Sequence, residues 1–423
     1  MKELNHKTSV ASGRLGSNMP ILIAGGGIGG LSLALMLHAR GLSCQVFEAV
    51  KEVKPLGVGL NTLPHAIDEL ANLGFLPDLD AVALRTRELR YLNRFGQEVW
   101  REPRGVWAGH PQPQFSIHRG QLHQVLWKAV QERLGAQALL TDARLADFEQ
   151  DEAGVTAWLT DGRRARGAAL IGADGIHSIL RSALHPTEGG VRWNGVQMWR
   201  GAVEWPAFLG GDTMLVCGDM CEKLVVYPIA SGTQADTRLT NWVVCAQVAD
   251  ASQKPPKPQD WSRPGQLDQV MAHASRFDLP MLDVKAMVCA TPQCWEYPMC
   301  DRDSLPFWTR GRVTLLGDAA HPMYPVGSNG ASQAILDARC LADQLAQREA
   351  VEALWAYEAE RLPKTSEIIR SNRLGGPERM LDLVAQRAPQ GFQQLTDVIA
   401  WQELAEIAGG YAHMTGMGSP PRS

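Results

Sequence analysis

A glycine-rich run near the start of the chain has the spacing of a dinucleotide-binding turn. The run Gly25-Gly26-Gly27-Ile28-Gly29-Gly30 matches G-x-G-x-x-G through its first, third and sixth residues. The first glycine permits a tight turn, the second lets the backbone approach a pyrophosphate, and the third lets helix and strand pack closely. The helix that follows presents N–H groups and a partial positive charge to the phosphates. Glu48 lies about 20 residues further on, where a carboxylate accepts hydrogen bonds from ribose hydroxyls. The alternative is a structural turn followed by a solvated glutamate.

A second candidate site lies far along the chain. An apolar strand ends in Gly317 and Asp318, and a loop rich in glycine and asparagine then leads into a helix at Gly330. A carboxylate at a strand end can hold a polyol such as a ribityl chain, and backbone N–H groups at a helix start can face an electron-rich ring. Together they predict a flavin, with Asp318 on the ribityl chain and the backbone of 327–331 at the pyrimidine edge. The helix dipole would stabilise negative charge on the reduced ring.

Two expected strands carry residues that could handle a substrate. Alternation places Lys223 and Tyr227 on one face of the first strand, and Met198 and Arg200 on one face of the second. A lysine beside a tyrosine could bind a carboxylate and orient or deprotonate a ring hydroxyl. The alternative is a solvated lysine and a tyrosine packed at the edge of a sheet.

The loop after the second site supplies further candidates. Tyr324 is predicted to line the substrate cavity, and Tyr227 and Pro325 are the candidate catalytic residues. His321 could act as an acid or base, with a packed loop histidine as the alternative.

Short apolar segments supply the strands that position these residues. Residues 21–24 predict a strand buried on both faces in a parallel sheet, a helix should follow to Ala39, and residues 44–47 predict the next strand. These elements form a strand–helix–strand unit. Further strands of this kind are expected at 168–171 and 313–316.

Between these strands the pattern changes. Segments from about 191 to 248 are typical of an antiparallel sheet, and the sequence from Gly330 onward is mainly helical with one buried face. The sequence therefore predicts a nucleotide-binding α/β domain built from separated segments, an inserted β-rich domain and a helical C-terminal part.

Composition excludes several other classes of protein. A net charge of −4 argues against a nucleic-acid or anionic-membrane partner, which would require a basic surface. Five glycines inside the uncharged run 20–37 argue against a membrane span there. The eight cysteines are scattered and form no CxxC pair, so neither a disulfide framework nor a zinc site is expected. Reduced thiols in a cytoplasmic protein, with no metal, are the expectation.

The ordered motifs resemble those of a known family, the class A flavoprotein monooxygenases related to p-hydroxybenzoate hydroxylase. They are the glycine run at 25–30, the Asp-Gly motif within 172–178, and the Gly-Asp pair at 317–318. The resemblance spans about 21–361. Within the family it is greatest to the phenazine hydroxylases, which act on a methylated phenazine carboxylate, through the stretches 55–59, 116–120, 198–201 and 324–337. Salicylate and 3-hydroxybenzoate hydroxylases are more distant.

This resemblance implies an α/β fold with a Rossmann-like FAD-binding domain of the p-hydroxybenzoate hydroxylase (GR2) type, an inserted β-sheet substrate domain and a C-terminal helical region. The expected ranges are a disordered extension at 1–19, FAD-binding segments at 20–105, 106–190 and 301–345, a substrate sheet at 191–300 and helices at 346–423.

The resemblance also assigns residues to the cofactor. Arg119 should contact FAD near its phosphate and ribityl portion, the alternative being a surface arginine at a helix start. Asp174 should organise the pyrophosphate region and nicotinamide access, the alternative being a turn aspartate before glycine. The full set of expected cofactor-binding residues is Gly25, Gly27, Ile28, Gly29, Gly30, Glu48, Val58, Gly59, Arg119, Asp174, Asp318, Gly327, Asn329 and Gly330, and the expected substrate-binding residues are Met198, Arg200, Lys223 and Tyr324.

The expected activity is hydroxylation of a small aromatic substrate, phenolic, carboxylated or N-heterocyclic, with FAD, NADPH or NADH, and O2, through a flavin C4a-hydroperoxide. A flavin-dependent reductase or oxidase without oxygen insertion is the alternative on the same fold. A non-catalytic flavin-binding protein is the third reading. A monomer or homodimer is expected, without nucleic-acid or membrane partners.

Overall fold

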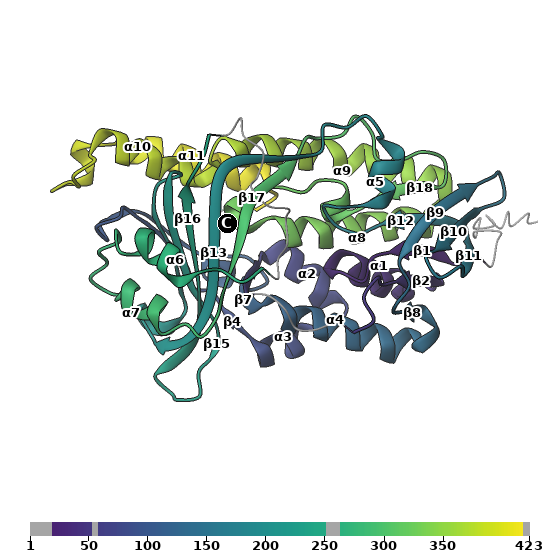
Figure 1. Ribbon diagram of the computed structural model, residues 1–423, viewed down its shortest axis with the longest axis horizontal. Helices are drawn as coiled ribbons and strands as arrows, with labels where there is room; N and C mark the ends of the chain where they lie inside the picture. The colour runs from purple at the N-terminus through teal and green to yellow at the C-terminus, as the bar shows by residue number, and fades with distance from the viewer. Residues whose placement is uncertain (1–18, 53–57, 251–262, 418–423) are drawn as a thin grey trace, which may run out of the picture.

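A five-stranded parallel sheet organises one half of the molecule (Figure 1). The computed structural model describes residues 19–52, 58–250 and 263–417, so the extension expected at 1–19 lies outside it except for Met19. The strand order is β18-β12-β1-β2-β8, with bounds Val313–Leu315, Ala169–Gly172, Ile21–Ala24, Cys44–Phe47 and Leu139–Leu140. β1 is buried along its whole length, as an all-apolar strand inside a parallel sheet should be. The predictions for β1 and β2 are confirmed to the residue.

Helices complete this half around one apolar core. α1 (Ile28–Ala39) packs on both α4 (Arg119–Leu134) and α8 (Gly330–Gln347), and α9 (Ala350–Arg373) packs on α8. The helix end predicted at Ala39 is confirmed. The shorter helices are α2 (Pro64–Asn72), α3 (Leu76–Val82) and α5 (Ile179–Leu184).

A seven-stranded, mostly antiparallel sheet organises the other half. Its order is β17-β13-β16-β15-β14-β5-β6, with bounds Cys294–Arg302, Val191–Pro206, Thr237–Gln247, Glu222–Ser231, Thr213–Gly218, Glu88–Leu92 and Glu98–Pro103. The β-rich insertion expected after about 191 is therefore present.

Two strands of this sheet come from a segment assigned to the FAD-binding half. β5 and β6 fall within the expected range 20–105, but β5 pairs in parallel with β14 and antiparallel with β6. That boundary was wrong because hydrogen bonding to a distant strand, rather than position along the chain, decides which sheet a strand joins. The other domain ranges stay a proposal.

The two faces of the seven-stranded sheet have different partners. One face packs on α6 (Leu267–Ala274) and α7 (Val284–Cys289) through a cluster that includes Trp242. On the other face, part of the sheet packs on α10 (Arg379–Arg387) and α11 (Trp401–Met414), and part faces the FAD-binding half. The C-terminal helices therefore close one side of the space between the halves (Figure 1).

Two three-stranded sheets complete the fold. β3 (Gly59–Thr62), β7 (Phe115–His118) and β4 (Ala83–Arg85) form one, which packs against β15. β9 (Leu145–Gln150), β10 (Val155–Leu159) and β11 (Arg164–Gly167) form the other. Among the described helices, none is both long and apolar enough to cross a bilayer.

Candidate active site

One cavity of about 350 Å³ joins the glycine turn, the late loop and the large sheet. This volume lies within the usual range for small-molecule pockets, roughly 300–1,000 Å³. The predicted site residues that line it are Gly27, Ile28, Gly29, Gly59, Arg119, Met198, Arg200, Lys223, Tyr227, Asp318, Pro325, Gly327, Asn329 and Gly330. The remote segments near residues 25 and 318 therefore meet at one cavity, as the sequence predicts.

The glycine turn divides into structural and cavity-facing positions. Gly25 has φ +110°, and a Cβ there would lie 2.3 Å from the Ala173 carbonyl oxygen. A Cβ on Gly30 would lie 2.1 Å from the carbonyl oxygen of Gly25. Gly27 lines the cavity, and a Cβ there would meet no protein atom within 4 Å. The first and last glycines thus permit close packing, while the middle one leaves space for a ligand.

Glu48 holds the glycine turn from behind. Its Oε2 accepts the Gly26 N–H at 2.8 Å and its Oε1 accepts the Val50 N–H at 2.9 Å. His123 Nε2 lies 2.6 Å from the Gly26 carbonyl oxygen. Glu48 is not among the residues that line the cavity, so ribose binding by this carboxylate stays a prediction.

The Gly-Asp pair follows β18 in a short 3₁₀ turn, Gly317–Ala319. The Asp318 side chain is exposed to the cavity but enclosed by protein beyond it. Burial raises its pKa, and the neighbouring His321 and Arg119 partly offset that effect. A polar ligand that donates hydrogen bonds would therefore find its acceptor here.

A buried carboxylate that the sequence did not single out supports this turn. Asp337 on α8 accepts the Gly317 N–H at 3.1 Å and pairs with Arg361 at 2.7 Å and with His321. Burial acts to raise its pKa, but His321 and Arg361 outweigh it and lower the value to about 2. His321 is thus a buried partner of Asp337, which matches the packed alternative.

Two predicted cofactor residues act behind the cavity wall. Asp174 accepts the Ile179 N–H at 2.9 Å, and burial raises the pKa of its carboxyl. Val58 is buried, and its carbonyl accepts the Arg119 N–H at 3.0 Å. Neither lines the cavity, so both shape the backbone and direct contact with a cofactor stays a prediction.

The sheet presents the expected substrate residues to the cavity. Arg200 Nη2 donates to the Gly59 carbonyl at 3.0 Å, and its guanidinium also interacts with Tyr227. Burial raises the pKa of Tyr227 to about 12, although Arg200 acts in the opposite direction. The phenol is therefore neutral near pH 7 and can donate a hydrogen bond, but it is not a base.

Lys223 also faces the cavity, but it is already paired. Its ammonium group forms a buried ion pair with Glu378, and both side chains are almost fully covered. Burial acts to lower the pKa of Lys223, but the Glu378 carboxylate outweighs it and the value is raised. A substrate carboxylate would have to compete with Glu378 for this lysine.

Tyr324 is not where the sequence predicted it. Its side chain is buried in an apolar cluster with Met198 and Tyr297 and does not line the cavity. Pro325 occupies the cavity wall instead. The loop turns between the two residues, so one side chain points into the cluster and the next toward the ligand space.

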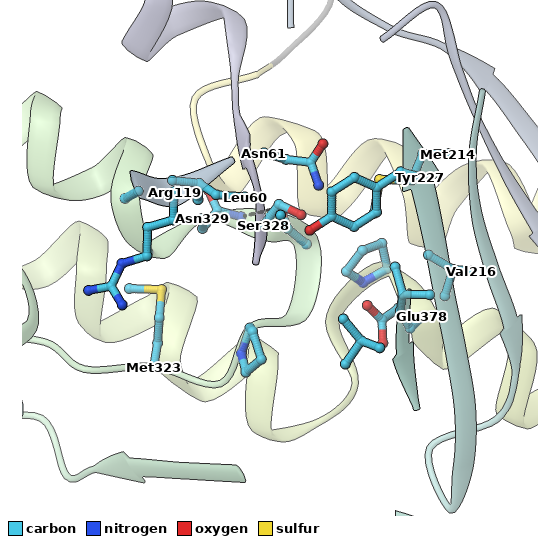
Figure 2. Close-up of a pocket in the computed structure, with 18 of the residues that line it drawn as sticks. Leu60, Asn61, Arg119, Met214, Val216, Tyr227, Met323, Ser328, Asn329 and Glu378 are labelled. Atoms are coloured by element: carbon cyan, nitrogen blue, oxygen red, sulfur yellow. Dashed lines mark hydrogen bonds between the residues drawn. The ribbon is translucent and has the colours of Figure 1, made fainter. Parts of the chain in front are cut away.

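The sequence analysis did not single out several residues that line the cavity. Figure 2 shows Arg119 and Met323 on one side of the pocket, and Tyr227, Val216 and Glu378 on the other. The missed lining residues include Asn61, Leu89, Tyr91, Glu102, Arg104, Met214, Val216, Glu378, Tyr411 and Met417. The only local signal was a pair of opposite charges two residues apart, Glu102 and Arg104, which form an ion pair at 2.6 Å. The C-terminal residues carry no motif.

Comparisons with known proteins point to one group. A family model described as FAD binding domain matches residues 18–372. The chain is 46% identical over 365 residues to phenazine 1,6-dicarboxylic acid hydroxylase PhzS of Lysobacter antibioticus, covering 84% of this chain and 89% of that protein. It is 31% identical over 405 residues to 3-hydroxybenzoate 6-hydroxylase of Polaromonas naphthalenivorans, covering 91% and 96%. Klebsiella pneumoniae HpxO complexed with FAD and uric acid is similar in structure, with a TM-score of 0.73 and 26% identity over 94% of this chain and 96% of that one.

The cavity residues fit an FAD molecule. Gly27 and Gly330 each begin or precede a helix, and a Cβ at either position would project into open space. Two helix N-termini therefore face the cavity with exposed backbone, which suits a pyrophosphate at one and the electron-rich edge of a flavin at the other. Asp318 lies at the same cavity, where it can accept hydrogen bonds from a ribityl chain.

Proposed function

We propose that this chain, which belongs to the FAD binding domain family, acts on a polycyclic N-heteroaromatic carboxylate. The chain is an FAD-dependent monooxygenase that uses NAD(P)H and O2 to hydroxylate an aromatic compound. The finer substrate class is supported by the relative at 46% identity, whose name specifies a phenazine dicarboxylic acid.

One observation carries the substrate proposal: the cavity continues from the cofactor residues into a pocket with apolar walls and a cation. Met198, Met214, Val216, Val225, Val243 and Met299 line it, together with Arg200. Flexible methionines and apolar valines can accommodate a fused ring system and exclude water from it. Arg200 can bind a carboxylate through charge-assisted hydrogen bonds.

The protein's part in the reaction is to bind and orient. When bound, FAD supplies the redox chemistry, accepting a hydride from NAD(P)H and activating O2. Arg200 holds the substrate carboxylate, and Tyr227 donates a hydrogen bond to a ring substituent or nitrogen. Pro325 closes the pocket beside the flavin loop. Holding the ring in one orientation raises the rate, because the entropic cost of aligning the reacting atoms is met when the substrate binds.

The test is a substrate panel with purified holoprotein: phenazine-1,6-dicarboxylic acid, unsubstituted phenazine, 3-hydroxybenzoate and uric acid. We expect the phenazine carboxylate to stimulate NAD(P)H consumption most, with one oxygen atom from ¹⁸O2 in the product. Stimulated consumption without labelled product would instead support a reductase or oxidase. Equal stimulation by unsubstituted phenazine would refute the role of the carboxylate.

A matched pair of arginine variants tests the cation. Arg200→Gln should raise KM for the carboxylated substrate roughly 10- to 150-fold, because a hydrogen bond to a charged group contributes about 1.5–3 kcal/mol. Arg192→Gln is the control, since Arg192 lies on the same strand but is exposed and pairs with Asp303 at 3.0 Å. An unchanged KM in Arg200→Gln would remove this residue from the substrate site.

Location and assembly are also proposals. The scattered cysteines support a reducing cytoplasm, and a monomer or homodimer remains the expected assembly.

A further inference from the structure

The C-terminal helix α11 reaches the flavin loop through one buried side chain, Tyr411. A Cβ on Gly327 would lie 2.4 Å from the Tyr411 hydroxyl, and a Cβ on Gly376 would lie 3.0 Å from its ring. The ring is therefore held between the backbone of the 326–328 turn and that of the segment after α9. Both glycines have positive φ, +64° and +52°, so neither position readily accepts another residue.

The Tyr411 hydroxyl forms hydrogen bonds with residues on both sides of the 326–328 turn. It accepts a hydrogen bond from Asn329 Nδ2 at 2.9 Å and lies 2.7 Å from Asn372 Oδ1, to which it donates. Asn372 Nδ2 in turn donates to the Tyr324 carbonyl at 3.1 Å. Asn329 Nδ2 also donates to the Gly327 carbonyl at 3.1 Å. One hydroxyl thus links the residues on either side of the turn to α9 and α11.

The turn needs such support because its backbone is unfavourable. Ser328 has φ +59°, a left-handed conformation that costs a non-glycine residue on the order of 1–2 kcal/mol. Surrounding contacts must offset this cost if the loop is to keep one shape. The loop leads directly into α8, whose first turn faces the cavity.

We propose that Tyr411 is a positioning residue for the flavin, holding the 326–330 backbone in the shape that receives the pyrimidine edge. This inference rests on the proposed placement of that edge at residues 327–331. Tyr411 lies beyond the 18–372 segment that the family model matches. Aligned backbone N–H dipoles stabilise a negative charge. A rigid loop therefore stabilises the negatively charged reduced ring more than it stabilises the uncharged oxidised ring.

The test compares Tyr411→Phe with Tyr357→Phe. Tyr357 is a matched control because its buried hydroxyl donates to the Leu315 carbonyl at 3.0 Å, away from the flavin loop. The readouts are the Kd of the apoprotein for FAD and the midpoint potential of the bound flavin. We expect Tyr411→Phe to weaken binding of oxidised FAD about threefold and of reduced FAD about fifteenfold. That fivefold difference lowers the two-electron potential by about 20 mV, at roughly 30 mV per tenfold. Tyr357→Phe should leave both quantities unchanged.

Asn329→Ala distinguishes failure of this inference from failure of its premise, the placement of the pyrimidine edge of the flavin at residues 327–331. If Asn329→Ala lowers the potential and Tyr411→Phe does not, the placement stands and the role of Tyr411 is refuted. If neither variant changes Kd or potential, the placement itself is wrong and the inference fails with it. If Tyr411→Phe does not fold, Asn372→Ala should lower the potential in the same direction. This variant keeps the ring but removes the nearer acceptor of its hydroxyl and the donor to the Tyr324 carbonyl, which leaves the Val326 carbonyl at 3.2 Å as the remaining acceptor. An unchanged potential in that variant also refutes the role.

Discussion

Replacing Gly27 by alanine should weaken FAD binding strongly while leaving the fold intact. Gly27 caps α1 with φ −77° and ψ −177°, an extended conformation that alanine adopts without strain. A Cβ there meets no protein atom within 4 Å, and the residue lines the cavity. The added methyl group would therefore occupy ligand space rather than protein space.

The two expected effects differ in size. At an N-cap, alanine is less favourable than glycine by about 0.5 kcal/mol, and reduced freedom of the unfolded chain offsets this by about 0.4–1 kcal/mol. The free energy of unfolding of the apoprotein should thus change by about 0.5 kcal/mol or less, a shift of about 1–2 °C in Tm. In the complex, a displaced pyrophosphate loses at least one charge-assisted hydrogen bond of about 1.5–3 kcal/mol, so Kd should rise roughly 10- to 150-fold.

Thermal unfolding of the apoprotein and fluorescence titration with FAD measure the two effects separately. Gly25→Ala and Gly30→Ala are the comparison, because their Cβ atoms would lie 2.3 Å and 2.1 Å from backbone oxygens. Both should lower the Tm of the apoprotein. The reasoning is refuted if Gly27→Ala binds FAD as tightly as the wild type, or if it destabilises the apoprotein as much as Gly25→Ala does.

Three further outcomes follow from buried groups. Lys223→Met should lower the free energy of unfolding, measured in urea, by about 3–5 kcal/mol, because Glu378 stays buried without its cation. The double variant Lys223→Met, Glu378→Leu should recover most of that loss, and no recovery would contradict the ion-pair explanation. The folded-state pKa of Asp337, about 2, lies below its ordinary value of 3.8, so the ionised carboxylate stabilises the fold above about pH 4 and this contribution is lost as the pH falls toward 2. The free energy of unfolding of Asp337→Asn should therefore differ from that of the wild type more at pH 6 than at pH 2.5. An equal difference at both pH values would count against this linkage. Tyr227→Phe should lower kcat about 2- to 12-fold, because it removes one hydrogen bond of about 0.5–1.5 kcal/mol. The pH profile of kcat between pH 6 and 9 should stay unchanged, because the pKa of Tyr227 is about 12. Loss of a titration in that range would show that Tyr227 acts as a base.

Local patterns accounted for the elements that carry the cofactor residues. β1, α1 and β2 have the bounds expected from apolar runs and a glycine stop, since such signals act within a few residues. Alternation along β15 also placed Lys223 and Tyr227 correctly on the cavity side, because side chains of a strand must alternate between its faces.

The sequence by itself therefore determined the nucleotide-binding unit, the Gly-Asp turn and the side-chain faces of the inserted strands, all of which follow from short-range geometry. Only the tertiary structure decided that β5 joins the large sheet, that Tyr324 turns into an apolar cluster, and that Glu378 and Tyr411 complete the cavity. These contacts join residues far apart in the chain. Their formation depends on the packing of whole elements against one another, and no local spacing or residue type records that packing.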